Sequence, residues 1–278
     1  MTKNKYNDIT RSDCSEIAWQ KRQQIEEMLD GVERRHGVYV LLAIENGSRA
    51  YGFASALSDY DVRFIYHHSP GWYVSAFSQR DNISLAPVHD IDAAGWDIAK
   101  FIRLLYRGNA TTYEWLNSPI IYRCDTEKLR ILQSLAGKVF NPEATFRHYL
   151  ALATKRFNDS RENPKKFLHL LRSLLSAKYI AEKHSPPPMS FEALVQEYLT
   201  PALRRDADKV LREKICVGMA EEKSTPDTTL DVVSSVLWHF AETCVNELAS
   251  TTFQCRREGD SEVFDDAMRA VIGIHSDN

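Results

Sequence analysis

The fold class of this 278-residue chain is decided by two nearby stretches, Glu45-Asn-Gly-Ser-Arg-Ala-Tyr-Gly52 and Ser58-Asp-Tyr-Asp-Val-Arg-Phe-Ile65. The apolar run before them, Val38 to Ile44, is rich in residues that favour β-structure and predicts a buried strand. Gly47 lets the backbone approach a ligand closely because it has no Cβ, and Ser48 adds a hydroxyl. Since the amides at the start of a short helix can face phosphate oxygens, this turn predicts an anion-binding site.

The second stretch carries two acids at the start of a predicted strand. Asp59 and Asp61 open an apolar run that ends at Tyr66, and the two-residue period of a strand places both carboxylates on one face, about 7 Å apart. Two such charges repel by roughly 4 kcal/mol at 4 Å in an effective dielectric constant near 20, so a cation between them is expected. Mg²⁺ typically binds one or two carboxylates together with substrate phosphates, so the pair predicts a metal–nucleotide site.

A third acid is expected from a neighbouring strand, which we place at Ile83 to Asp92. Asp90 and Asp92 share a face of that strand, so alternation leaves both open. We favour Asp92, at the expected strand end where a site would open. A helix from about Gly95 to Tyr106 is predicted next because its apolar residues share one face.

These features together resemble a known superfamily. A Gly-Ser pair separated by ten residues from Asp-x-Asp, with a later strand acid, resembles the DNA polymerase β-type nucleotidyltransferases. Four longer strings resemble the RlaP family, predicted nucleotidyltransferases named for their association with RNA ligases: Glu45 to Asp61, Asp92 to Leu105, Tyr113 to Arg123 and Pro186 to Met189. The resemblance implies an α+β fold with a small mixed β-sheet nucleotidyltransferase core and flanking helices, followed by an α-helical C-terminal domain.

The resemblance also implies a set of site residues. The catalytic acids, which would also be the ligands of two Mg²⁺ ions or of Mn²⁺, are Asp59, Asp61 and Asp92. The turn residues that would bind the nucleoside triphosphate are Gly47 and Ser48. Lys100 is implied as a further nucleotide contact by the likeness around it.

The residues themselves suggest three further roles near the site. Arg49 would pair with phosphate or cover the surface, and both alternatives stay open. Arg63 shares the face of Asp61 by alternation, so it would neutralise carboxylates or meet phosphate. Glu45 would either brace the turn or end its strand.

Other charged and aromatic residues have more ordinary interpretations. A charged, solvated helix face is favoured over a phosphate-binding role for Lys165, Lys166 and Arg172. Core packing is favoured over base stacking for Trp72, Trp96 and Trp115. No metal-ligand spacing is present in the set His67, His68 and His89, and no catalytic role is assigned to them.

Composition and the positions of helix-breaking residues indicate the domain organisation. With 44% hydrophobic residues and a net charge of −3, the chain is expected to form two domains, a nucleotidyltransferase catalytic domain over 1–140 and a helical domain over 141–278. Helices are predicted from Asp13 to about Gly37, after Pro226 and from Val263 to Ile274.

The chain also lacks several diagnostic patterns. The N-terminus has no apolar signal-like region and no run approaches about 18 apolar residues, so a cytoplasmic protein without membrane contact is expected. The cysteines predict neither a disulfide framework nor a zinc site, because they are odd in number and form no Cys-x-x-Cys pair: Cys14, Cys124, Cys216, Cys244 and Cys255. Motifs of dinucleotide oxidoreductases, P-loop NTPases, α/β-hydrolases and zincins are absent.

The sequence therefore predicts a Mg-dependent nucleotidyltransferase. It would move a nucleoside monophosphate from an NTP to a hydroxyl acceptor and release pyrophosphate, and the association with RNA ligases favours an RNA end over a protein side chain or a small molecule. The alternative is a nucleotide-binding regulatory or antitoxin-like protein that acts through a protein or RNA partner. No oligomeric state is predicted.

Overall fold

The computed structural model describes residues 17–77, 79–88, 90–157, 159–217, 233–253 and 261–274. Its strands are β1 (Tyr39–Asn46), β2 (Tyr60–His67), β3 (Asn82–Ser84), β4 (Ile91–Asp97) and β5 (Ile121–Cys124). Its helices in the first half are α1 (Trp19–His36), α2 (Gly47–Tyr51), the 3₁₀ turn η1 (Pro70–Val74), α3 (Ile98–Tyr106), α4 (Ala110–Leu116) and α5 (Thr126–Lys138). Those in the second half are α6 (Pro142–Phe157), α7 (Pro164–Lys183), α8 (Phe191–Tyr198), α9 (Pro201–Val217), α10 (Ser235–Ala249) and α11 (Ser261–Ile272).

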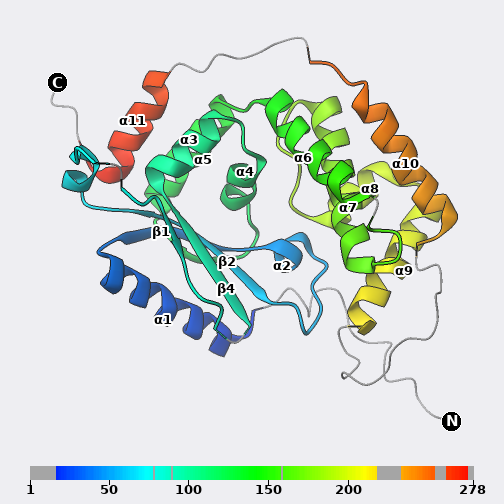
Figure 1. Ribbon diagram of the computed structural model, residues 1–278, viewed down its shortest axis with the longest axis horizontal. Helices are drawn as coiled ribbons and strands as arrows, with labels where there is room; N and C mark the ends of the chain where they lie inside the picture. Colours follow the sequence, from blue (N-terminus) through cyan, green and yellow to red (C-terminus); the bar gives the residue numbers. More distant parts are fainter. Residues whose placement is uncertain are drawn as a thin grey trace.

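The strands form one mixed sheet in the order β3-β4-β2-β1-β5 (Figure 1). Strands β2 and β4 are parallel, whereas β1 pairs antiparallel with β2 and β5, and β3 pairs antiparallel with β4. The chain after the sheet is helical. The predicted α+β class, with a small mixed sheet and a helical C-terminal region, is confirmed.

Alternation along β2 divides the sheet into two faces. Val62, Phe64 and Tyr66 pack into a core cluster with Leu29 and other residues of α1, which covers one face. Ile65 belongs to the second cluster, which contains α3, α4, α5 and the helical region. Figure 1 shows α1 on one side of the sheet and α3 to α5 on the other. Asp61 and Arg63, in the same alternation as Ile65, therefore face the helical region.

The first helix ends where the sequence predicts. Gly37 follows α1 with φ 63°, a left-handed conformation that glycine adopts without steric cost, and its amide donates to the carbonyl of Glu33. Asp13, where the helix was expected to begin, lies outside the described residues. So do Glu16, Cys14, His89, Pro226 and Cys255.

The predicted boundary between the third acid's strand and the next helix was wrong. Gly95 is a strand residue, and the helix begins three residues later at Ile98, with the Asp97 carboxylate accepting from the Ala99 amide at 2.8 Å. A Cβ at Gly95 would lie 2.1 Å from the Phe64 ring, so a glycine is needed for the strands to pair under that ring. Asp92 therefore lies near the start of its strand, not at its end.

The helical region joins the first half through a buried polar contact. Arg172 of α7 donates to Glu114 of α4 at 2.9 Å, and the same carboxylate accepts from Tyr51 at 3.1 Å and Tyr149 at 2.8 Å. Only 4% of Arg172 is exposed, so the expected solvated face was wrong for this residue. Removing one partner of such a pair leaves the other charge buried and uncompensated.

One apolar cluster continues from the sheet into the helical region. The helix α11 packs against α3 and α5 of the first half (Figure 1), with Tyr106 and Phe264 in edge-to-face contact at 5.2 Å. The predicted helix near the C-terminus is confirmed, and the division near residue 140 stays a prediction. Within the described ranges, no helix is both long and apolar enough to cross a membrane.

Candidate active site

The turn between β1 and α2 brings the backbone against a carboxylate. Gly47 has φ 64°, and a Cβ built there would lie 2.1 Å from Oδ2 of Asp61. Any other residue would collide with this oxygen and would also be strained at that φ. The sequence feature that suggested close approach of a ligand thus first serves the approach of Asp61, while Ser48 lies next to it and is 8% exposed.

The register of β2 and β4 selects between the two candidates for the third acid. Asp61 lies directly opposite Asp92 on the parallel neighbour. Asp90 turns away to Lys21, whose ammonium donates to it at 2.6 Å and helps to hold the pKa of this exposed carboxyl below its usual value. The geometry therefore brings Asp92, and not Asp90, beside the Asp-x-Asp pair.

Arg63 lies between the two facing carboxylates. Its Nη2 is 2.7 Å from Oδ2 of Asp92 and 3.2 Å from Oδ1 of Asp61, and its Nη1 donates to the carbonyls of Asp92 and Val62. Of the two roles left open for Arg63, neutralising carboxylates is the one that this geometry displays. Across the described residues, no three His, Cys, Asp or Glu side chains converge as preformed metal ligands.

The acids interact electrostatically. Burial raises the pKa of Asp61, and the neighbouring charges of Asp92 and Asp59 raise it further, while Arg63 and Lys165 act in the opposite direction. Asp59, just before β2, is exposed and lines the same cavity as Asp61. Asp59 and Asp92 thus both interact electrostatically with Asp61.

Glu45, at the end of β1, braces this group from behind. Its carboxyl is fully buried, accepts from the Asp61 amide at 3.0 Å and from the Tyr122 hydroxyl at 2.6 Å. Burial raises the pKa of Glu45 to about 7. The main-chain carbonyl of the same residue accepts from Ser118 at 2.6 Å. Of the two roles considered for Glu45, bracing is the one that these contacts support.

A cavity of 370 Å³ opens in front of Asp59, Asp61 and the turn, and Asp92 is not among the residues that line it. The sheet side of its wall is formed by Gly47, Ser48, Ser55, Leu57, Ser58, Asp59 and Asp61. The helical region supplies Asn163, Pro164, Lys165, His169 and Lys214. Acids on one wall therefore face cations on the other, an arrangement suited to a ligand that carries both a metal and phosphates.

Among the cavity residues that the sequence analysis did not indicate, two are titratable, His169 and Lys214. His169 follows Lys165 by one helical turn on α7, and this i, i+4 spacing could have indicated a shared face. Burial, together with Arg156 and other nearby cations, lowers the pKa of His169 to about 3, so the ring is neutral at pH 7. Lys214 gave no local signal: it comes from α9 and donates to the Phe53 carbonyl and to Ser58.

Three predicted nucleotide contacts do not line the cavity: Arg49, Lys100 and Arg63, which was described above. Arg49 stacks over the Tyr60 ring at 3.9 Å and donates to the Ser58 carbonyl at 2.6 Å, so it braces the entry to β2. Lys100 donates to Asp81 at 3.3 Å. Lys100 lies in α3, which follows the C-terminal end of β4. That end is about 16 Å along the strand from Asp92.

The structure also shows where the other aromatic and basic residues considered in the sequence lie. Trp115 is 2% exposed and stacks with Trp96 at 4.1 Å, as expected for core packing. Trp72 is half-buried and stacks on His68. Lys166 is half-exposed and lies 3.9 Å from Asp159, whereas Lys165 faces the cavity.

A comparison with protein families identifies the family to which the chain belongs. The chain matches the RlaP family, described as an RNA repair pathway DNA polymerase beta family, over residues 21–252. The chain belongs to this family. The matched range contains the acids, the turn and the cationic wall of the cavity. The resemblance predicted from the Gly-Ser and Asp-x-Asp motifs is confirmed.

Two individual proteins resemble this RlaP-family chain. The uncharacterized protein YcgL of Bacillus subtilis (strain 168) is 32% identical over 243 residues, which cover 85% of this chain and 90% of YcgL. A nucleotidyltransferase-like protein from Exiguobacterium sibiricum 255-15, known from a crystal structure, is 14% identical with a TM-score of 0.33. That match covers 81% of this chain and 74% of the other. The fold assignment rests on the sheet and helices described above.

Proposed function

We propose that this chain is a nucleotidyltransferase that moves a nucleoside monophosphate from an NTP to a hydroxyl acceptor, with an RNA end as the favoured acceptor. The observation that carries the proposal is the opposition of carboxylates and cations across one cavity, beside a glycine turn. Membership in a family described by RNA repair favours RNA as the acceptor.

Asp59, Asp61 and Asp92 would hold Mg²⁺, as two ions, with Mn²⁺ as a substitute. Support comes from the in-register pair Asp61 and Asp92, which already binds a cationic group, the Arg63 guanidinium, between its carboxylates. When bound, the metal would lower the pKa of the acceptor hydroxyl and offset the charge of the triphosphate.

The chain's own groups would position the reactants. The acceptor oxygen forms a bond to the α-phosphorus while the bond from that phosphorus to the bridging oxygen breaks, and pyrophosphate leaves. Asp92 would take up the hydroxyl proton. Ser48 and Lys165 lie on opposite walls of the cavity and would donate to phosphate oxygens, stabilising the charge on the leaving pyrophosphate.

The test uses each α-³²P-labelled NTP with Mg²⁺ or Mn²⁺, total RNA and cell lysate. Wild type should label RNA, and Asp59→Ala and Asp61→Ala should each reduce labelling by about two to three orders of magnitude, as after loss of a preorganised charge-stabilising group. Asp266→Ala, which removes an exposed acid of α11, is the matched control and should label normally. Normal labelling by both site variants would contradict the proposal.

A second candidate is a nucleotide-binding regulatory protein that acts through a protein or RNA partner. The same ion pairs of Arg63 also fit this function, because a guanidinium that stays between Asp61 and Asp92 would compete with a metal for these carboxylates. Thermal unfolding with NTP and Mg²⁺ separates the two functions. A regulatory protein would be stabilised by the nucleotide but would release no pyrophosphate, whereas the transferase would show both effects in the presence of its acceptor.

A further inference from the structure

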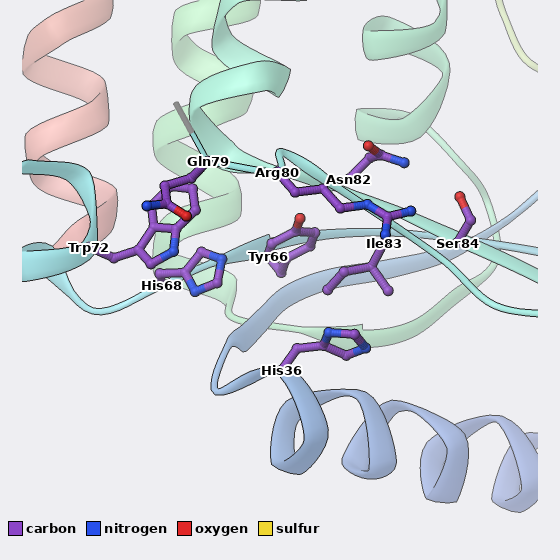
Figure 2. Close-up of a pocket in the computed structure, with 9 residues that line it drawn as sticks. All are labelled: His36, Tyr66, His68, Trp72, Gln79, Arg80, Asn82, Ile83 and Ser84. Carbon is purple, nitrogen blue, oxygen red and sulfur yellow. The ribbon is translucent and has the colours of Figure 1, made fainter. Parts of the chain in front are cut away.

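A second cavity of 230 Å³ lies on the other face of the sheet (Figure 2). Tyr66 lines it and is five residues beyond Asp61 on β2, so alternation directs the two side chains to opposite faces, about 16 Å apart along the strand. His36, at the end of α1, and Ile83, on β3, lie on the same side as Tyr66. The cavity is therefore separate from the candidate active site.

The hydroxyl-bearing side chain of Tyr66 lines this cavity. The Tyr66 residue is 1% exposed, and no hydrogen bond joins its hydroxyl to a described residue. Burial raises the pKa of Tyr66, so the phenol keeps its proton and has one to donate. A protonated phenol that lines a cavity can donate a hydrogen bond to an oxygen-bearing ligand bound there.

The wall of the cavity favours an anion. Arg80 extends along it (Figure 2), lies close enough to Tyr66 to influence the phenol, and makes no hydrogen bond or ion pair within the described ranges. No carboxylate is among the described residues that line the cavity. The nearby acids are bound elsewhere, Asp81 by Arg103 at 2.8 Å and Asp97 by the Tyr73 hydroxyl at 2.8 Å.

One end of the cavity is aromatic. His68 and Trp72 stack with ring centroids 4.0 Å apart and an interplanar angle of 8°. Burial, with a contribution from His36, lowers the pKa of His68, so the pair is an uncharged wall at pH 7. Figure 2 shows this pair on the side of the cavity away from Ser84. Aromatic rings stack on the flat face of a nucleobase whichever base it is.

We propose that this second cavity binds a nucleoside monophosphate unit, with the phosphate on Arg80, Tyr66 and His36 and the base against the His68–Trp72 pair. The guanidinium, the phenol and the imidazole supply donors for several phosphate oxygens, which matches a phosphate better than a neutral ligand. The unit is either a free mononucleotide or the 5′-terminal nucleotide of an RNA. The inference is independent of nucleotidyl transfer at the first cavity.

The experiment is calorimetric titration of the full chain in EDTA with AMP, GMP, CMP, UMP, adenosine and inorganic phosphate. At least one mononucleotide should bind more tightly than both adenosine and phosphate. Arg80→Gln should weaken binding of this mononucleotide about tenfold, as expected for loss of a charge-assisted hydrogen bond. Tyr66→Phe should weaken it about fivefold, as expected for loss of a neutral one. Trp72→Leu should weaken binding of the mononucleotide and leave the affinity for inorganic phosphate unchanged.

Two controls locate the ligand. Lys165→Gln removes a cation from the first cavity and Arg147→Gln an exposed arginine of α6, and both should bind the mononucleotide as wild type does. Weakening by Lys165→Gln alone, equal binding of phosphate and mononucleotide, or no binding at millimolar concentration would each overturn the proposal. Thermal unfolding confirms that the variants fold.

A short RNA with and without a 5′-phosphate distinguishes the two sources. Tighter, Arg80-dependent binding of the phosphorylated RNA than of the mononucleotide would identify an RNA end as the ligand. Mononucleotide binding without RNA binding would identify a free nucleotide.

Discussion

Glu45→Gln should remove a pH-dependent loss of stability that is built into the end of β1. The Glu45 carboxyl is fully buried between the Asp61 amide and the Tyr122 hydroxyl, and burial raises its pKa from the ordinary value of 4.5 to about 7. The glutamine has nearly the same shape. Its oxygen can accept from the amide while its NH₂ donates to the phenol oxygen, so both contacts can be kept.

The sign follows from proton binding. Between pH 4.5 and 7 the folded chain binds more protons at Glu45 than the unfolded chain does, so the free energy of unfolding falls as the pH rises. At about 1.4 kcal/mol per pKa unit, the difference between the two pKa values amounts to about 3 kcal/mol, fully lost above the folded pKa. Glutamine has no charge to desolvate, so position 45 adds no pH dependence to the free energy of unfolding of the Glu45→Gln variant.

The assay is urea unfolding of both proteins at half-unit steps from pH 5 to 8.5. The advantage of Glu45→Gln over wild type should grow by about 2.5 kcal/mol across this range, mostly before pH 7.5, because part of the loss occurs below pH 5. Glu143→Gln, which removes a partly exposed acid of α6, is the matched control and should follow the wild-type profile. Parallel profiles for wild type and Glu45→Gln would refute the reasoning, because contributions from other titrating groups cancel in this comparison.

Three further substitutions test the packing around the site. Arg172→Met should lower the free energy of unfolding by about 3–5 kcal/mol because it leaves Glu114 charged and buried, and urea unfolding should show partial recovery when Glu114→Gln is added. Gly95→Ala should cost about 1–3 kcal/mol through its clash with the Phe64 ring, and an equal cost in a Phe64→Leu background would exclude that cause. Gly47→Ala should abolish NTP labelling in a chain that still unfolds cooperatively, since its Cβ would displace the neighbouring carboxylate; full labelling would contradict this.

Local patterns in the sequence predicted where several residues of the candidate site lie in the fold. The strand, the turn at Gly47 and the acids at Asp59 and Asp61 are contiguous in the chain, and strand alternation alone places Asp61 and Arg63 on one face. The end of α1 at Gly37 was also readable, because a glycine that follows an apolar helical pattern is a local signal.

The errors have physical causes that a local pattern does not contain. Ala93, Ala94 and Gly95 have low intrinsic preference for strands, and they form β4 because pairing with β2 and the Phe64 ring require small residues there. The contribution of Lys214 to the cavity depends on a contact with Phe53 across 161 positions of sequence. No periodicity reports such a contact.

The position of α11 has a consequence for how the chain is made. The roughly 120 residues between α5 and α11 take on the order of 6–25 s to synthesise at 5–20 residues per second. Throughout that interval the apolar surface of α3 and α5, which Phe264 and its neighbours cover in the finished protein, has no permanent occupant. The sheet can form early on the ribosome, but its outer helices stay open to chaperones and to other nascent chains until the last helix emerges.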